Sequence, residues 1–158
     1  MWDSNNGYAE VHYTTFSVGA SGTNYQLTIG GFDSPNPYGL QDELVASNGA
    51  PFSTSDIDNT GGSCATKTNM FLDAPWWYPT TGCPTVSLFS KNENTDFADL
   101  HAGIHWNSFG GLRQSYKEVR MAIRPTNWDS VKSTGFSSAT VDAVLVPYNE
   151  DTFQAQYK

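Results

Sequence analysis

The chain has 158 residues, with 16 acidic side chains against 8 Lys and Arg and a formal net charge of −8 at pH 7. One domain of this length can bury a sizeable core. The acidic balance argues against nucleic acid or an anionic membrane surface as the partner, because both bind a basic face. No apolar run approaches the roughly 18 residues of a membrane span, so we expect no membrane insertion.

The first part of the chain has the pattern of an antiparallel hairpin. Residues Tyr8 to Val18 are rich in β-branched and aromatic side chains, and Asn24 to Gly30 alternate polar and apolar positions. The short link between these runs contains glycine, which favours a hairpin connection. The next segment, Leu40 to Ala46, predicts a short helix that ends at Asn48-Gly49.

The second part predicts long loops and isolated strands. Regular structure is scarce from Pro51 to Pro84. Tyr116 to Arg124 alternates, with apolar side chains on one face, and predicts a half-buried strand. Thr140 to Val146 predicts a further strand. We therefore expect an α+β fold, with a mainly antiparallel twisted sheet, few short helices and a large loop-rich subdomain for calcium and ligand.

A glycine-rich loop with two carboxylates is the first candidate site. The candidate segment is Asp56-Ile-Asp58-Asn-Thr60-Gly-Gly62. Its two aspartates can bind one hard cation, and main-chain carbonyls can complete an all-oxygen shell. An EF-hand is excluded, because its twelfth position needs a bidentate Glu and holds Lys67 here. The loop is then either a calcium site or a pair of solvated aspartates that cap turns.

The two cysteines allow two interpretations. Cys64 and Cys83 both stand in loop contexts rich in Gly and Pro. A disulfide between them would contribute about 3 kcal/mol in the chain-entropy model and would imply secretion. The alternative is a pair of reduced, buried thiols.

No hydrolytic constellation competes with a binding function. His101 and His105 have the spacing of a zinc pair on a helix, but no Glu lies between them and Gly103 weakens a helix there. The nucleophile-elbow motif Gly-x-Ser-x-Gly does not occur. We expect a protein that is not an enzyme.

Motifs that occur in order over most of the chain carry a family resemblance. They are Gly7-Tyr-Ala-Glu10, Tyr13-Thr-Thr-Phe16, Tyr25-Gln-Leu27, Gly30-Gly-Phe32, Asn48-Gly-Ala-Pro-Phe-Ser-Thr54, Trp76-Trp-Tyr78, Gly103-Ile-His-Trp106 and Met121-Ala-Ile-Arg-Pro125. Together they resemble the C-terminal two-thirds of a fibrinogen-related domain, the module of ficolins, tachylectins and fibrinogen chains. Residues 1–125 would form this domain without its N-terminal subdomain, and residues 126–158 a C-terminal extension with a candidate added strand.

The resemblance implies a ligand set for Ca²⁺ and a disulfide. The calcium ligands fall on the side chains of Asp56 and Asp58 and on the main-chain carbonyls of Thr60 and Gly62. The family's disulfide falls on Cys64 and Cys83, and its cis peptide bond before the first cysteine falls on Ser63-Cys64.

The resemblance also implies a ligand pocket beside the calcium loop. Lectins of the family bind acetyl groups there, and the corresponding positions are Ser63, Cys64, Thr68, Trp76, Trp77, Pro84, Leu100 and His101. Three positions depart from the family pattern. Pro84 replaces a His, Leu100 replaces a Tyr, and Thr68 replaces an aromatic residue.

These observations predict a secreted, extracellular recognition module. It would be a calcium-binding, lectin-like protein whose partner is an acetylated glycan or a related ligand. The alternative is an extracellular structural or assembly protein, whose fibrinogen-like scaffold makes protein–protein contacts and forms oligomers or filaments. We expect an oligomer in either case.

Overall fold

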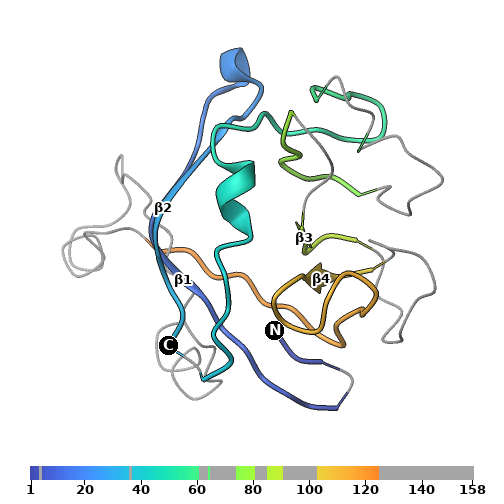
Figure 1. Cartoon of the computed structure of the whole chain (residues 1–158). Helices are drawn as coiled ribbons and strands as arrows, with labels where there is room; N and C mark the ends of the chain where they lie inside the picture. The colour runs from blue at the N-terminus through green and yellow to red at the C-terminus, as the bar shows by residue number, and fades with distance from the viewer. Residues whose placement is uncertain are drawn as a thin grey trace, which may run out of the picture.

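The computed structural model describes residues 1–3, 5–35, 37–60, 64, 74–80, 85–90 and 103–124. The described elements are the strands β1 (His12–Val18), β2 (Leu27–Asp33), β3 (Val86–Ser87) and β4 (His105–Trp106), and the 3-10 turns η1 (Ser21–Thr23) and η2 (Leu44–Ser47). They form two two-stranded antiparallel sheets, β1–β2 and β3–β4 (Figure 1). Among these residues no helix is both long and apolar enough to cross a membrane.

The predicted hairpin is confirmed. β1 pairs with β2 in one antiparallel register, with Tyr13 opposite Phe32 and Val18 opposite Leu27, and the pairing is interrupted at Thr14, opposite Gly31, whose φ is 67°. Between the strands, η1 is followed by Asn24 and Tyr25, whose φ angles are 50° and 55°. Two left-handed residues in succession reverse the chain within a few positions, and the second of them is a bulky residue that rarely adopts this conformation.

The outer edge of β2 is closed by the segment that follows η2. The amide of Leu27 donates to the carbonyl of Ala50 at 2.9 Å, and the amide of Gly49 donates to the carbonyl of Leu27 at 2.8 Å. The side-chain oxygen of Asn48 accepts the amide of Ile29 at 3.0 Å. The helix predicted over residues 40–46 is only the single turn η2, which begins at Leu44, because the chain must extend again to make these bonds.

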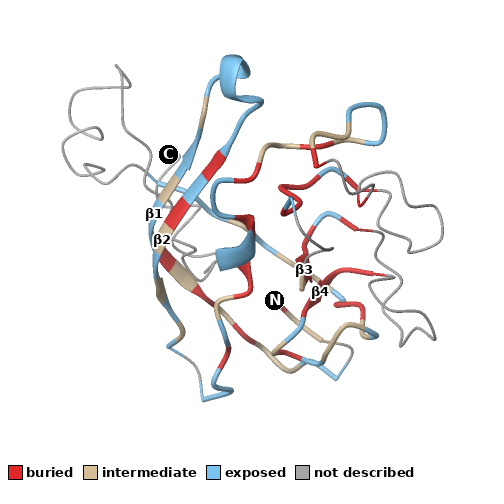
Figure 2. Cartoon of the chain, turned by 45° about the horizontal axis from the view of Figure 1, so that its top comes forward, coloured by how far each residue is buried: buried red, intermediate tan, exposed pale blue. Residues whose placement is uncertain are grey.

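The largest side chains of the core are aromatic. The largest fully buried residues include Trp76, Trp106, Tyr13, Tyr78 and Tyr116. They belong to one cluster that also takes in Leu27 and Ile29 of the hairpin. Figure 2 shows buried residues both on the hairpin and around β3 and β4. Loops therefore supply much of the core, and short strands suffice to position them.

The segment 41–43 joins the hairpin to the β3–β4 sheet. The Tyr13 hydroxyl donates to the carboxylate of Asp42. The indole N–H of Trp106 donates to the carbonyl of Gln41 at 3.1 Å, and Glu43 accepts the amide of Ser108 at 2.9 Å. Glu43 is only 8% exposed, so its carboxylate is committed to this contact.

The prediction of a strand from Tyr116 to Arg124 is wrong, because this described segment forms no strand. The segment makes only an isolated antiparallel bridge between Trp2 and Glu118. Val119 and Met121 pack against the core, whereas Ile123 is 56% exposed. The alternation reports which side chains are buried, but a strand also needs a neighbouring backbone. Thr140 to Val146, and all of residues 125–158, lie outside the described residues.

Replacing Tyr116 by Phe should lower the free energy of unfolding by about 1–3 kcal/mol. The Tyr116 hydroxyl accepts the amide of Trp106 at 2.9 Å and donates to the carbonyls of Trp106, at 2.8 Å, and Phe109. Its loss leaves the buried Trp106 amide without an acceptor. Urea denaturation measures the change. Tyr25→Phe is the control, because that ring is 52% exposed and should change stability by no more than about 0.5 kcal/mol. Equal effects would contradict the prediction.

Candidate functional site

The carboxylate-bearing loop is anchored on a buried tryptophan. Ser53 and Trp76 form an antiparallel bridge, with the Ser53 amide 2.9 Å from the Trp76 carbonyl and the reverse bond at 3.0 Å. The Ser53 hydroxyl accepts the amide of Asn59 at 3.0 Å, and the Asn59 side chain donates to the carbonyl of Phe52 at 2.6 Å. The beginning and the end of the loop are thus tied to each other and to the core.

Asp56 lies on a tight turn at the exposed side of this loop. Thr54 and Ile57 bond reciprocally through their backbones, at 2.9 and 3.2 Å. The Thr54 hydroxyl donates to Oδ1 of Asp56 at 2.6 Å. This hydrogen bond, together with a backbone hydrogen bond, holds the pKa of Asp56 below its ordinary value of 3.8. The carboxylate is therefore ionised at neutral pH and faces solvent.

Asp58 is held differently, in a side-chain turn. Its Oδ1 accepts both the amide of Thr60, at 2.8 Å, and the Thr60 hydroxyl, at 2.5 Å. This arrangement is an Asx turn, in which the side chain mimics a backbone carbonyl. Thr60 itself is only 6% exposed. Both bonds end on Oδ1, so Oδ2 is the oxygen of Asp58 that a cation would take.

The described structure reaches only part of the sequence-predicted site. Asp56, Asp58, Thr60, Cys64, Trp76 and Trp77 are described, whereas Gly62, Ser63, Thr68, Cys83, Pro84, Leu100 and His101 lie outside the described residues. In the described part no three His, Cys, Asp or Glu side chains gather as a metal site. The predicted calcium set takes only two carboxylates and completes its shell with carbonyls, so it stays a prediction.

Cys64 is buried, with 1% of its surface exposed, and the described chain contains no free cysteine. Its predicted partner, Cys83, is outside the described residues, as is Ser63 of the predicted cis peptide bond. The Cys64–Cys83 pairing and the cis bond remain predictions.

The tryptophan pair lies beneath the loop and not on its surface. Trp76 is 0% and Trp77 8% exposed. The Trp77 ring makes edge contacts with Phe16, Phe52 and Trp76, and its N–H donates to the carbonyl of Tyr25 at 2.8 Å. Neither indole presents a face on which a sugar ring can stack. Within the described structure their role is to support the loop.

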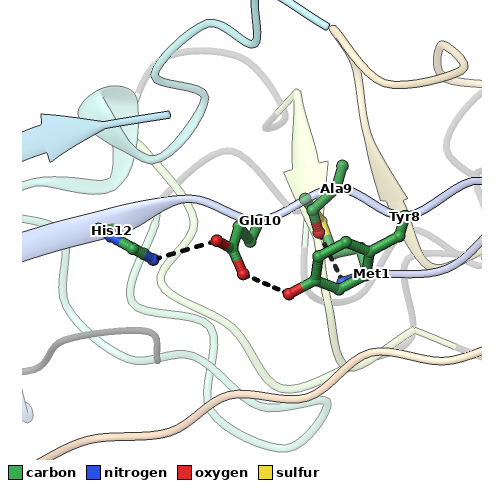
Figure 3. A network of polar contacts seen from close by, with 5 residues as sticks. All are labelled: Met1, Tyr8, Ala9, Glu10 and His12. Carbon is green, nitrogen blue, oxygen red and sulfur yellow. Dashed lines mark hydrogen bonds and ion pairs between the residues drawn. The ribbon is translucent and has the colours of Figure 1, made fainter. Parts of the chain in front are cut away.

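A polar network near the start of the chain was not singled out from the sequence. Figure 3 shows that the Tyr8 hydroxyl donates to one oxygen of Glu10, whose other oxygen lies 3.7 Å from Nε2 of His12. Burial and the Glu10 carboxylate raise the pKa of Tyr8, which keeps this phenol protonated as a donor. The signal was the spacing Tyr-x-Glu-x-His, since alternate residues of an extended chain share a face. The network orients these three side chains relative to one another.

Comparisons with known proteins agree on one family. The family model described as the C-terminal globular domain of fibrinogen beta and gamma chains matches residues 1–126. Angiopoietin-4 of Bos taurus is 30% identical over 125 residues, which cover 79% of this chain and 24% of that protein. Ryncolin-4 of Cerberus rynchops is 30% identical over 132 residues, covering 83% and 36%. Ficolin-3 of Homo sapiens is 32% identical over 124 residues, covering 77% and 38%.

A solved structure agrees with the sequence relatives. The fibrinogen-like globe domain of human ANGPTL6 is 26% identical, with a TM-score of 0.61, over 73% of this chain and 49% of that one. The resemblance inferred from the motifs is therefore confirmed, as are the antiparallel strands and the small helical content. The chain spans about a quarter to two fifths of the length of the three relatives named above.

Replacing Thr54 by Val should raise the pKa of Asp56 toward 3.8, because it removes the hydroxyl that stabilises the carboxylate. A carboxyl group with a depressed folded-state pKa stabilises the fold above its unfolded pKa, and this contribution is lost as the pH falls through the folded pKa. The variant should lose part of this acid dependence. NMR titration of the Asp56 side chain, without calcium, measures the pKa. Ser55→Ala, in the same exposed turn, is the control. An unchanged pKa in Thr54→Val would show that the hydroxyl does not set it.

Proposed function

The chain belongs to the family of fibrinogen C-terminal globular domains, and on this premise we propose that it is an extracellular recognition module, without enzymatic activity, that binds Ca²⁺ at residues 56–62. The observation that supports this most is the loop geometry. Two aspartates, one exposed and ionised and one in an Asx turn, are carried by a loop whose ends are bonded to each other and to Trp76. Bound Ca²⁺ would supply a positive charge that orders the loop.

The proposed ligands fit calcium by their chemistry. Carboxylate oxygens of Asp56 and Asp58 and main-chain carbonyls of Thr60 and Gly62 form a hard, all-oxygen set, and such sets suit Ca²⁺ or Mg²⁺ better than softer metals. Two charged ligands predict a weak site, with a dissociation constant of about 10⁻⁴ to 10⁻³ M, as in other extracellular modules. Such a site fills only where free calcium is high, which agrees with a secreted protein.

The proposed disulfide fixes the other end of the loop. Cys64 lies four positions after Thr60 in the sequence, and it is buried and carries no free thiol. Pairing with Cys83 would tether the segment on both sides of the Trp76–Trp77 support. The bond would add about 3 kcal/mol by restricting the unfolded chain.

The proposed ligand is an acetylated glycan, bound beside the ordered loop. The pocket would be formed by Ser63, Cys64, Thr68, Pro84, Leu100 and His101. In this arrangement calcium shapes the pocket and does not contact the sugar. The buried tryptophans hold the loop from below, so a weaker core contact there would also weaken the pocket.

A second candidate is a protein ligand at the same loop, as in a structural or assembly protein. Ile57 stands between the two aspartates and is 59% exposed. An exposed apolar side chain at the tip of the loop suits a protein surface better than a hydrated sugar. Pro84, Leu100 and Thr68 also lack the polar and aromatic groups that the family's acetyl pocket uses.

The double variant Asp56→Asn, Asp58→Asn should weaken calcium binding at least tenfold, because the proposed site has no other charged ligand. The amide side chain introduced at position 58 retains an Oδ1 acceptor for Thr60, so the turn should persist. Isothermal titration calorimetry measures the affinity, and circular dichroism checks the fold. Asp33→Asn, another exposed carboxylate, is the matched control. Equal calcium affinity in the double variant and the control would place the metal elsewhere.

Binding to N-acetylglucosamine should require calcium if the pocket is shaped by the loop. A glycan array or calorimetric titration, with 5–10 mM calcium (roughly tenfold above the expected dissociation constant) and then with chelator, tests this. We expect binding that is lost on chelation and restored by added calcium. Chelator-insensitive binding would separate the sugar site from the metal. Absence of binding to any acetylated glycan would favour the protein-ligand candidate.

A further inference from the structure

The two ends of the carboxylate loop are joined through one residue, Asn59. Its side-chain nitrogen Nδ2 donates to the carbonyl of Phe52 at 2.6 Å, and its backbone N–H donates to the hydroxyl of Ser53 at 3.0 Å. Asn59 is half-buried, so water competes for these bonds less than it would at an exposed position. We call Asn59, together with its partners Phe52 and Ser53, the loop clamp.

The loop clamp is attached to a fixed part of the core. Ser53 is 0% exposed, and its backbone exchanges two hydrogen bonds with Trp76, which is also 0% exposed. The Ser53 hydroxyl therefore holds Asn59 from a segment that cannot shift without breaking this bridge. The position of Asn59 is thus set by the core and not by the exposed side of the loop.

Asn59 stands between two residues that carry proposed calcium ligands, Asp58 and Thr60. Because the peptide bond is planar, the N–H of one residue and the carbonyl of the residue before it form one rigid unit. The hydrogen bond to Ser53 fixes the unit between Asp58 and Asn59. The unit between Asn59 and Thr60 is fixed by the hydrogen bond from the Thr60 amide to Oδ1 of Asp58 at 2.8 Å. Both peptide units that flank Asn59 are therefore held before a cation binds.

The loop clamp opposes a repulsion within the loop. Asp56 and Asp58 are two positions apart, and like charges repel each other when no cation is bound. In a loop without tertiary contacts, this repulsion would favour conformations that separate the two carboxylates. The side chain of Asn59 is neutral and its hydrogen bond goes to a backbone carbonyl. It therefore restrains the loop without adding to the repulsion.

We propose that Asn59 is a positioning residue of the calcium site, which does not contact the cation but holds Asp58 and Thr60 in place before the cation binds. This role rests on the proposed calcium binding at residues 56–62. Its consequence is that part of the ordering cost of binding is met during folding. Loss of the loop clamp would transfer this cost to the binding step, and the ordering of a single residue corresponds to about tenfold in affinity.

Calorimetric titration with calcium, together with amide hydrogen exchange in its absence, tests the proposal on the full chain. Asn59→Leu removes the donor and nearly preserves the size of the side chain. It should lower calcium affinity about tenfold and, without calcium, speed exchange of the Thr60 amide at least about tenfold. Saturating calcium should restore the protection of that amide. Asn107→Leu, the same change at an exposed asparagine outside the loop, is the matched control and should alter neither quantity.

A second variant removes the other bond of the loop clamp. Ser53→Ala deletes the hydroxyl and leaves the backbone bridge to Trp76 in place. If the two bonds act as one unit, the double variant Ser53→Ala, Asn59→Leu should bind calcium no more than about twofold more weakly than Asn59→Leu alone. Should circular dichroism show that Asn59→Leu does not fold, Ser53→Ala is compared with the control by the same two measurements.

Three results would overturn the proposal. Equal calcium affinity in Asn59→Leu and Asn107→Leu would confine Asn59 to stabilising the fold, while the calcium site itself would stand. A lower affinity with unchanged exchange of the Thr60 amide would make Asn59 a direct ligand of the cation. Absence of calcium binding by the unaltered chain would reject the calcium site and this role with it, whatever the variants do.

Discussion

Aromatic side chains that carry a hydrogen-bonding atom into the core hold the loops of this protein in place. The indole N–H groups of Trp77 and Trp106 donate to the carbonyls of Tyr25 and Gln41, and the Tyr78 hydroxyl donates to the carbonyl of Ala74. Each such bond joins a buried ring to a backbone segment without regular structure. Because buried polar groups are costly unless they are paired, the rings can pack only where these carbonyls stand, and the loops are fixed as a consequence.

This constraint connects the core to the candidate site. The loop with Asp56 and Asp58 begins at the bridge between Ser53 and Trp76, and Trp76 packs against Trp77 and Phe89. Asp56 is thus exposed and Asp58 half-buried, but the loop that carries them is bonded to Trp76, which is fully buried. A cation bound by such a loop meets donors whose backbone is already positioned, which reduces the ordering cost of binding.

The hairpin is the one long regular element among the described residues. The edge formed by β2 is closed by the segment 48–50. A two-stranded hairpin is marginal by itself and gains stability from further strands or from packing. Side chains from both faces of the hairpin belong to the core cluster, Leu27 and Ile29 from one face and Tyr13 from the other, and this packing supports the sheet.

Local patterns in the sequence were sufficient for several features. The alternation of Asn24 to Gly30 and the glycine-containing link predicted the hairpin, because strand periodicity and turn chemistry act within a few residues. The two carboxylates of the loop were visible for the same reason, and ordered motifs identified the family. For residues 140–146 and for Gly62, Cys83 and Leu100 the sequence still carries the whole argument.

Only the tertiary structure decided which of these patterns pair with a neighbouring strand and which side chains are buried in the core. The alternation of Tyr116 to Arg124 placed Val119 and Met121 against the core, yet beyond Glu118 no described strand runs alongside, so no sheet forms there. For Trp76 and Trp77 the family resemblance favoured packing beneath the site over a platform for a sugar, and their burial in the structure decides for packing. Side-chain periodicity is set by the local backbone, whereas strand pairing and burial depend on residues that are distant in sequence, and these come together only in the folded chain.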